Sequence, residues 1–178
     1  DASDAAIYMN DQEVSYYASY NGWRTAEPYY WPKNGKLSFI AYSPSTAGED
    51  MESLAYGAAG YTFTGFSLKA DPTDQYDLMY SERALNKISS NDGSGSGVYD
   101  CVDLNFRHAL SCIEFRVRNG SNFTSKIVLK GLKINNAYSK GTFEENIDTG
   151  NQATYNANPA WKDQAEVNNY TLPVVATG

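Results

Sequence analysis

Apolar and polar residues alternate with a period of two along much of the chain, and this pattern predicts β-strands. The two clearest runs are residues 102–106 (VDLNF) and 113–117 (IEFRV). Alternation of this kind gives a strand one buried face and one solvated face. With Arg107 and Cys112 counted in the strands, only residues 108–111 connect them. This connection leaves room only for an antiparallel return, because parallel strands need a much longer one.

Elsewhere in the chain the alternation is weaker and is interrupted by residues that favour turns, which predicts short strands separated by turns. Further strands are predicted at 14–20, 37–42, 61–64, 66–70, 76–80 and 126–130, with another beginning near Leu132. Residues 81–88 are the one helical candidate, about two turns long. The Gly- and Ser-rich residues 89–97 are predicted to form a loop, and the Asn-rich residues 146–169 an irregular segment. Short strands with frequent turn signals favour a sandwich or a barrel.

Composition narrows the function classes. The 178 residues include 14 Lys and Arg against 21 Asp and Glu, for a net charge of −7. An acidic surface repels phosphate backbones, which argues against nucleic-acid binding. The single histidine excludes a histidine-based metal cluster and leaves only His108 for a catalytic triad. At a strand corner, His108 is better explained by a structural hydrogen bond than by general-base catalysis.

The two cysteines are predicted to be free thiols. Cys101 and Cys112 each begin their own strand, so an antiparallel pair places them at opposite ends. At about 3.3 Å per residue their separation is on the order of 20 Å. A disulfide requires Cα atoms within roughly 7 Å of each other.

Several acidic residues are of the types that bind calcium or catalyse glycoside hydrolysis. Calcium ligation would draw on the oxygens of Asp71, Asp74, Asp77, Asn91 and Asp92. Their spacing does not match the twelve-residue calcium loop, so solvated acidic turns are the preferred interpretation. Paired carboxylates occur at Asp50 with Glu52 and at Glu144 with Glu145. Such pairs arise by chance in an acidic chain, and we predict no catalytic residue, cofactor or metal.

Aromatic residues crowd the first 31 positions. A candidate binding surface consists of Tyr16, Tyr20, Trp23, Tyr29 and Tyr30. Aromatic faces stack on sugar rings, so these residues suggest a glycan-binding platform. Large aromatic side chains are also used in the core and rim of a sandwich and at subunit interfaces. A structural role of this kind is the preferred interpretation.

Five stretches, in order, resemble one known family. They are residues 29–32 (YYWP), 37–44 (LSFIAYSP), 77–81 (DLMYS), 102–111 (VDLNFRHALS) and 113–117 (IEFRV). Together they resemble the N-terminal domain of the fimbrillin-like proteins of Bacteroides and relatives. No single stretch is specific, but the ordered series spans residues 29–117.

The resemblance implies a fold and a role. It implies an all-β, two-sheet, transthyretin-like β-sandwich of about seven strands at residues 1–165, with 166–178 as a linker or the start of a second sandwich domain. It also implies a lipoprotein exported to the cell surface at the outer membrane, with its lipid anchor outside this chain. The expected partners are other fimbrial subunits, joined by strand donation, and a host or bacterial surface receptor.

The resemblance also suggests a processing site. In the best-known members a protease cuts after an arginine and removes an N-terminal strand. The first arginine here is Arg24, which follows the predicted strand 14–20. The expected function is therefore that of a non-enzymatic adhesion protein or fimbrial subunit. The alternative is a monomeric surface glycan-binding module.

Overall fold

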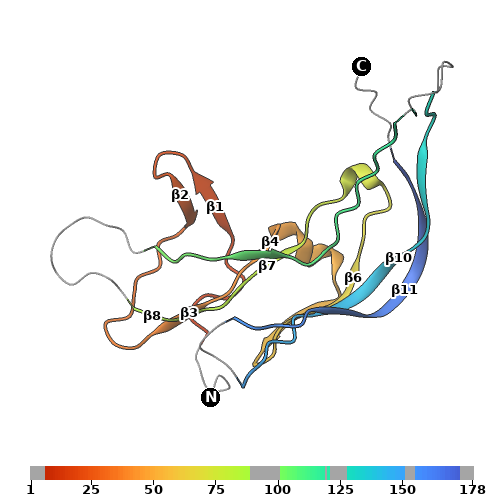
Figure 1. Cartoon of the computed structure of the whole chain (residues 1–178). Coiled ribbons are helices and arrows are strands. Elements are labelled where there is room, and N and C mark those ends of the chain that lie inside the picture. The colour runs from red at the N-terminus through yellow and green to blue at the C-terminus, as the bar shows by residue number, and fades with distance from the viewer. Residues whose placement is uncertain (1–6, 89–100, 119, 121–127, 151–154, 173–178) are drawn as a thin grey trace.

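A computed structural model describes residues 7–88, 101–118, 120, 128–150 and 155–172. The chain is nearly all β (Figure 1). The elements in the described residues are β1 (Val14–Tyr17), β2 (Gly22–Thr25), β3 (Leu37–Phe39), β4 (Tyr42–Ser43), the 3₁₀ helix η2 (Ser45–Asp50), β5 (Ser53–Gly57), β6 (Gly60–Ser67), the 3₁₀ helix η3 (Pro72–Asp74), β7 (Met79–Ser81), β8 (Ala84–Lys87), β9 (Phe106–His108), β10 (Leu132–Glu144) and β11 (Ala160–Leu172).

These strands form four sheets, and every pairing is antiparallel. The largest sheet has the order β11-β10-β6-β5, and a three-stranded sheet has the order β4-β7-β9. Two small sheets pair β3 with β8 and β1 with β2. In Figure 1 the long hairpin of β10 and β11 curves along one side, and the β1–β2 hairpin projects at the other end.

An aromatic core joins the four-stranded sheet to the three-stranded sheet. Phe63 of β6 stacks on Phe143 of β10, with ring centres 5.6 Å apart and planes inclined by 21°. Tyr80 of β7 lies 5.1 Å from Phe143, measured between ring centres. All three side chains are buried. Offset stacking and tilted packing both suit aromatic quadrupoles, so the sheets pack face to face through rings.

The predicted fold class is confirmed, since the structure is all-β with a sandwich-like arrangement of sheets. The expected number of about seven strands is wrong, because the described residues contain eleven. Part of the difference comes from region 37–42, where a break divides the expected strand into β3 and β4. In the opposite sense, the strands predicted at 61–64 and 66–70 are joined in β6, where Gly65 has φ +63°.

The predicted helix at 81–88 is wrong. Ser81 ends β7, and its N–H donates to the Ala41 carbonyl while its hydroxyl accepts from the Ala41 N–H, both at 2.8 Å. Ala84 then begins β8 opposite Phe39 and is buried. Partners some 40 residues away therefore outweigh the local helical pattern.

The prediction of an irregular segment at 146–169 is also wrong, because β11 begins at Ala160 and continues past residue 165. Most of β11 is exposed, so its sequence lacks the apolar alternation of a buried strand. Register shifts against β10 further obscure the pattern, and Asp163 and Glu166 both have φ +50°.

The two clearest predicted strands give unequal outcomes. In the region 102–106 only Phe106 lies in a strand, at the start of β9. Residues 113–117 lie in no strand of the described structure. Of the predicted strand 126–130, residues 128–130 are not in a strand and the other two lie outside the described residues, as do 89–97.

Candidate functional site

Residues 111–118, which we call the open segment, follow β9 and lie in no strand of the described structure. Their backbone makes no hydrogen bond to another described residue. Their apolar face is exposed, with Ile113 63%, Phe115 46% and Val117 62% accessible. An extended chain with unpaired backbone and alternating apolar side chains is a template for pairing with a further strand.

The polar face of the open segment is satisfied locally. The Arg116 Nε donates to Glu114 Oε1 at 2.8 Å, and its second nitrogen donates to Oε2 at 3.1 Å. The hydrogen bond to Glu114 raises the pKa of the Arg116 guanidinium. The apolar face of the segment takes no part in these polar contacts and stays half to two-thirds exposed.

The chain is firmly held immediately before the open segment. His108 pairs with Met79 across the β7–β9 ladder. The Ala109 N–H donates to the Leu78 carbonyl at 2.8 Å, and the Trp161 indole Nε1 donates to the Ala109 carbonyl at 2.8 Å. The open segment is therefore anchored at one end to both large sheets.

His108 itself makes a polar contact between its Nδ1 and a carboxylate oxygen of Asp77. Both side chains are exposed. This contact matches the predicted structural hydrogen bond for His108. The histidine connects β9 to the residues just before β7.

The β1–β2 hairpin (Val14–Thr25), which we call the aromatic hairpin, carries three of the five predicted surface aromatics. Tyr16 lies opposite Trp23 in the ladder, and Trp23 is 70% exposed. The two ring centres are 5.9 Å apart and the planes are inclined by 65°. The Tyr16 hydroxyl donates to Asn21 Oδ1 at 2.8 Å. The pair therefore forms a corner rather than a flat platform.

Arg24 is part of the same ladder, opposite Ser15 in β1. Its guanidinium carbon lies 3.7 Å from the centre of the Tyr20 ring, which is a cation–π contact. The predicted processing site is thus in paired strand structure, with its side chain packed on an aromatic ring.

The other two predicted aromatics, Tyr29 and Tyr30, lie beyond the aromatic hairpin. The Tyr29 hydroxyl donates to Gln12 Oε1 at 2.8 Å, and its ring packs edge-on against Tyr8 at 6.0 Å. Tyr30 is exposed, and its carbonyl accepts from the Tyr8 hydroxyl. The structure therefore groups the five residues into two clusters.

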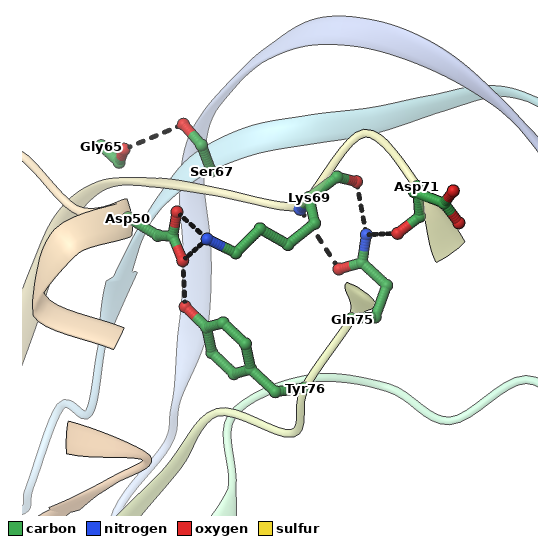
Figure 2. A network of polar contacts seen from close by, with 7 residues as sticks. All are labelled: Asp50, Gly65, Ser67, Lys69, Asp71, Gln75 and Tyr76. Atoms are coloured by element: carbon green, nitrogen blue, oxygen red, sulfur yellow. Dashed lines mark hydrogen bonds and ion pairs between the residues drawn. The ribbon is translucent and has the colours of Figure 1, made fainter. Parts of the chain in front are cut away.

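A polar network joins η2 to the loop that contains η3 (Figure 2). The Lys69 ammonium lies 2.6 Å from each carboxylate oxygen of Asp50, and the Tyr76 hydroxyl donates to Asp50 Oδ2 at 2.7 Å. The Gln75 side chain binds the backbone of the same loop. Its oxygen accepts a hydrogen bond from the Lys69 N–H at 3.3 Å. Its amide nitrogen donates to the Asp71 carbonyl at 3.4 Å.

The contacts in this network shift the pKa values of Asp50 and Tyr76. Burial alone would raise the pKa of Asp50, but the hydrogen bonds from Lys69 and Tyr76 outweigh it and lower the pKa. Burial and the hydrogen bond to Asp50 raise the pKa of Tyr76. Sequence reasoning missed this network because its partners lie 19 and 26 residues apart.

Glu145 is a buried carboxylate that directly follows β10. It accepts hydrogen bonds from the Tyr61 N–H at 2.9 Å and from the Tyr155 hydroxyl at 2.8 Å. Burial raises its pKa, although these hydrogen bonds and the positive charges of Arg83 and Arg107 oppose the shift. The role of this residue is to hold β6 and the 155 region against β10.

The two carboxylate pairs considered from the sequence are engaged in separate contacts. Glu144 binds Lys162, whereas its neighbour Glu145 is buried. Asp50 binds Lys69, whereas Glu52 binds Lys140 at 2.9 Å. These ion pairs join neighbouring strands and loops.

The remaining candidates occupy turns and exposed chain. Asp71 caps η3, accepting from the Thr73 N–H at 2.8 Å. Within the described ranges no group of three or more His, Cys, Asp or Glu side chains is placed to hold a metal ion. Asn91 and Asp92 lie outside those ranges. Cys101 and Cys112 are exposed free thiols. In the part of the chain that the structure describes, no helix is long and apolar enough to cross a membrane.

These features define a class: an all-β protein of sandwich-like architecture. A family model described as "Fimbrillin-like" matches residues 1–177, and the chain belongs to this family. No curated protein and no solved structure matches the chain.

Family membership supports a general role as a fimbrial subunit. The family is one of structural, non-enzymatic subunits, and it implies a cell-surface fimbrial location and assembly with other fimbrial subunits.

Proposed function

We propose that this chain is a fimbrial subunit that accepts a β-strand from a neighbouring subunit along the open segment. The observation that carries the proposal is the combination of a backbone at residues 111–118 that makes no hydrogen bond to another described residue with the exposed apolar face of Ile113, Phe115 and Val117. Strand addition supplies main-chain hydrogen bonds for affinity, and alternate side chains set the register.

The energetics favour a strand rather than a globular surface as the partner. Burying a large apolar side chain completely contributes about 1.5–3 kcal/mol, and these three side chains are half to two-thirds exposed. An added strand with apolar side chains at every second position covers them together. It also pairs the backbone groups that lack partners among the described residues.

Arg24 is the proposed processing site within this function. Because Arg24 lies in the β1–β2 ladder, a protease gains access to it only when the aromatic hairpin opens. Processing is therefore expected to follow local unfolding of residues 14–25. Export as an outer-membrane lipoprotein and a receptor on a host or bacterial surface belong to the same proposal and are supported by family membership alone.

The two cysteines provide a matched test of strand acceptance. Cys112 lies in the open segment, whereas Cys101 lies outside it, and both are exposed free thiols. Cys101→Ser and Cys112→Ser each leave one thiol. In fibres recovered from the native host, maleimide labelling of Cys112 should be much slower than in monomers, while labelling of Cys101 should stay unchanged.

A second variant tests the apolar face directly. Phe115→Asp places a charge on the face that the incoming strand would cover, and it should abolish incorporation into fibres while the monomer remains folded. Glu114→Gln, on the opposite face, is the control and should incorporate normally. Equal labelling of Cys112 in fibres and monomers, or normal incorporation of Phe115→Asp, would contradict the proposed acceptor.

A monomeric glycan-binding module is the second candidate, and the exposed ring of Trp23 is the observation that favours it. The 65° inclination between Trp23 and Tyr16 restricts stacking to one ring at a time. A glycan array should then show binding by the monomer that Trp23→Ala removes. Binding that survives Trp23→Ala would rule out the aromatic hairpin as the site.

A further inference from the structure

The two edges of the four-stranded sheet differ in how they are protected. β5 forms one edge and β11 the other. All five residues of β5 are exposed, and β5 pairs with β6 through five consecutive residue pairs without a register shift. Its outer side has no strand partner in the described structure. β5 is thus a regular edge strand that another strand could extend.

β11 carries the features that prevent edge-to-edge pairing. It contains the charged residues Lys162, Asp163 and Glu166, and the last two have φ +50° within a bulged ladder. Charges and bulges are the usual protection of an exposed edge. β5, with the sequence SLAYG, contains no charged residue, no proline and no bulge.

The core face of the sheet is also partly exposed at β5. Leu54 lies opposite Phe63, and Tyr56 lies opposite Tyr61, so Leu54 and Tyr56 belong to the core face of the sheet. Their partners in β6 are buried, yet Leu54 is 40% and Tyr56 37% exposed. The Tyr56 ring packs on Tyr61 with centres 5.1 Å apart. A strand added beside β5 would therefore extend both the sheet and the core face.

We propose that β5 pairs with β5 of a second copy of this chain, antiparallel and about a two-fold axis at Ala55. In this register Leu54 of each copy lies opposite Tyr56 of the other, and the two Ala55 residues face each other. Ser53 lies opposite Gly57 of the second copy, so all five residues of both strands overlap. The pairing is self-complementary because a two-fold interface uses the same patch on both subunits.

Two properties of the strand favour its own copy as the occupant. Aliphatic–aromatic cross-strand pairs such as Leu54 with Tyr56 are favourable, and the register places no like charges opposite each other. Glu52, the charged residue that directly precedes the strand, already binds Lys140 within the chain. The net charge of −7 opposes association at long range, so salt should strengthen the dimer.

A charge-swap experiment tests both the contact and its axis. Ala55 is exposed and lies on the face opposite the core, so a long polar side chain is tolerated there. Ala55→Lys and Ala55→Glu each place like charges opposite each other in a homodimer and should weaken association about fivefold or more. An equimolar mixture of the two variants places Lys opposite Glu and should restore dimerisation.

The readout is the mass of the full chain by sedimentation velocity over a wide concentration range. The interface is short, so a weak dimer is expected, with the mass rising above the monomer value of 19.6 kDa only at high concentration. Asn168→Lys on the β11 edge is the matched control and should dimerise like the original chain. Urea unfolding of each variant verifies that it is folded.

Three results would overturn the proposal. The first is a monomeric original chain at every concentration. The second is a mixture of Ala55→Lys and Ala55→Glu that associates no better than either variant alone. The third is loss of the dimer in Asn168→Lys. The contact is separate from the open segment, so its failure leaves strand acceptance at 111–118 standing, and the reverse also holds.

Discussion

The Glu145 carboxylate accepts a hydrogen bond from the Tyr61 backbone N–H at 2.9 Å, across 84 residues of sequence. The contact joins the end of β10 to the start of β6, beside the two-residue turn that follows β5. Gly60 precedes Tyr61 with φ +93°, and a Cβ atom built on Gly60 would lie 2.1 Å from Glu145 Oε2. The glycine and the buried glutamate therefore depend on each other.

Gly60→Ala should strongly destabilise the protein. Alanine is strained at φ +93°, and its methyl group would push Glu145 from its buried position. The expected loss is at least about 2 kcal/mol in the free energy of unfolding, measured with urea. Gly57→Ala is the control, because a Cβ there meets nothing within 4 Å, and its effect should stay within about 0.5 kcal/mol.

The buried Glu145 should leave a signature in the pH dependence of stability. Burial raises its pKa in the folded state, so its contribution is fully present below the unfolded pKa and is lost as the pH rises through the folded pKa. Relative to Glu145→Gln, the original chain should therefore lose stability as the pH rises above about 4.3, the ordinary pKa of glutamate.

Comparing the two proteins isolates this residue from other carboxylates. Asp50 has a lowered pKa, so its contribution is lost as the pH falls, but it is present in both proteins and cancels. Glu13→Gln, at an exposed position, should parallel the original chain. A constant difference between the original chain and Glu145→Gln from pH 4 to pH 7 would refute the prediction.

The ion pair between Lys69 and Asp50 should contribute modestly. Lys69 is partly exposed, so solvent screens the interaction even though Asp50 is mostly covered. A double-mutant cycle with Lys69→Gln and Asp50→Asn should give a coupling of about 0.5–1 kcal/mol in the free energy of unfolding. A cycle that pairs Lys69→Gln with the distant Glu13→Gln should give no coupling.

Limited trypsin digestion should cut after Arg116 before it cuts after Arg24. The Arg116 backbone has no strand partner in the described residues and its side chain is 85% exposed, whereas Arg24 is paired in β2. Intact-mass analysis over time should show the fragments in that order. Arg116→Gln should remove the early cut, and Trp23→Ser, which weakens the aromatic hairpin, should speed cleavage at Arg24.

The sequence predicted best where one strand face is buried. In β6, Tyr61 and Phe63 are buried and the alternation is plain, so a strand was expected there and is found. It failed at Ala160–Leu172, where an exposed and bulged edge strand needs no apolar alternation. It also failed at Ala84–Lys87, where pairing with β3 overrides a local helical pattern.

For the candidate site, too, the sequence predicted some features and the structure was needed for others. The alternation at 113–117 identified the apolar face of the open segment, but only the structure showed that this face has no strand beside it among the described residues. The aromatic cluster was visible in the sequence, whereas its division between the aromatic hairpin and Tyr29 and Tyr30 was not.

By itself, the sequence determined that the protein is all-β, acidic and similar to the fimbrillin-like family, because alternation, charge and motif order are local properties of the chain. The tertiary structure decided which strands lie at edges, that Glu145 is buried beneath Gly60, and that Lys69 meets Asp50. These relationships depend on pairing between residues tens of positions apart. Such pairing is set by packing in the folded chain, which no local pattern records.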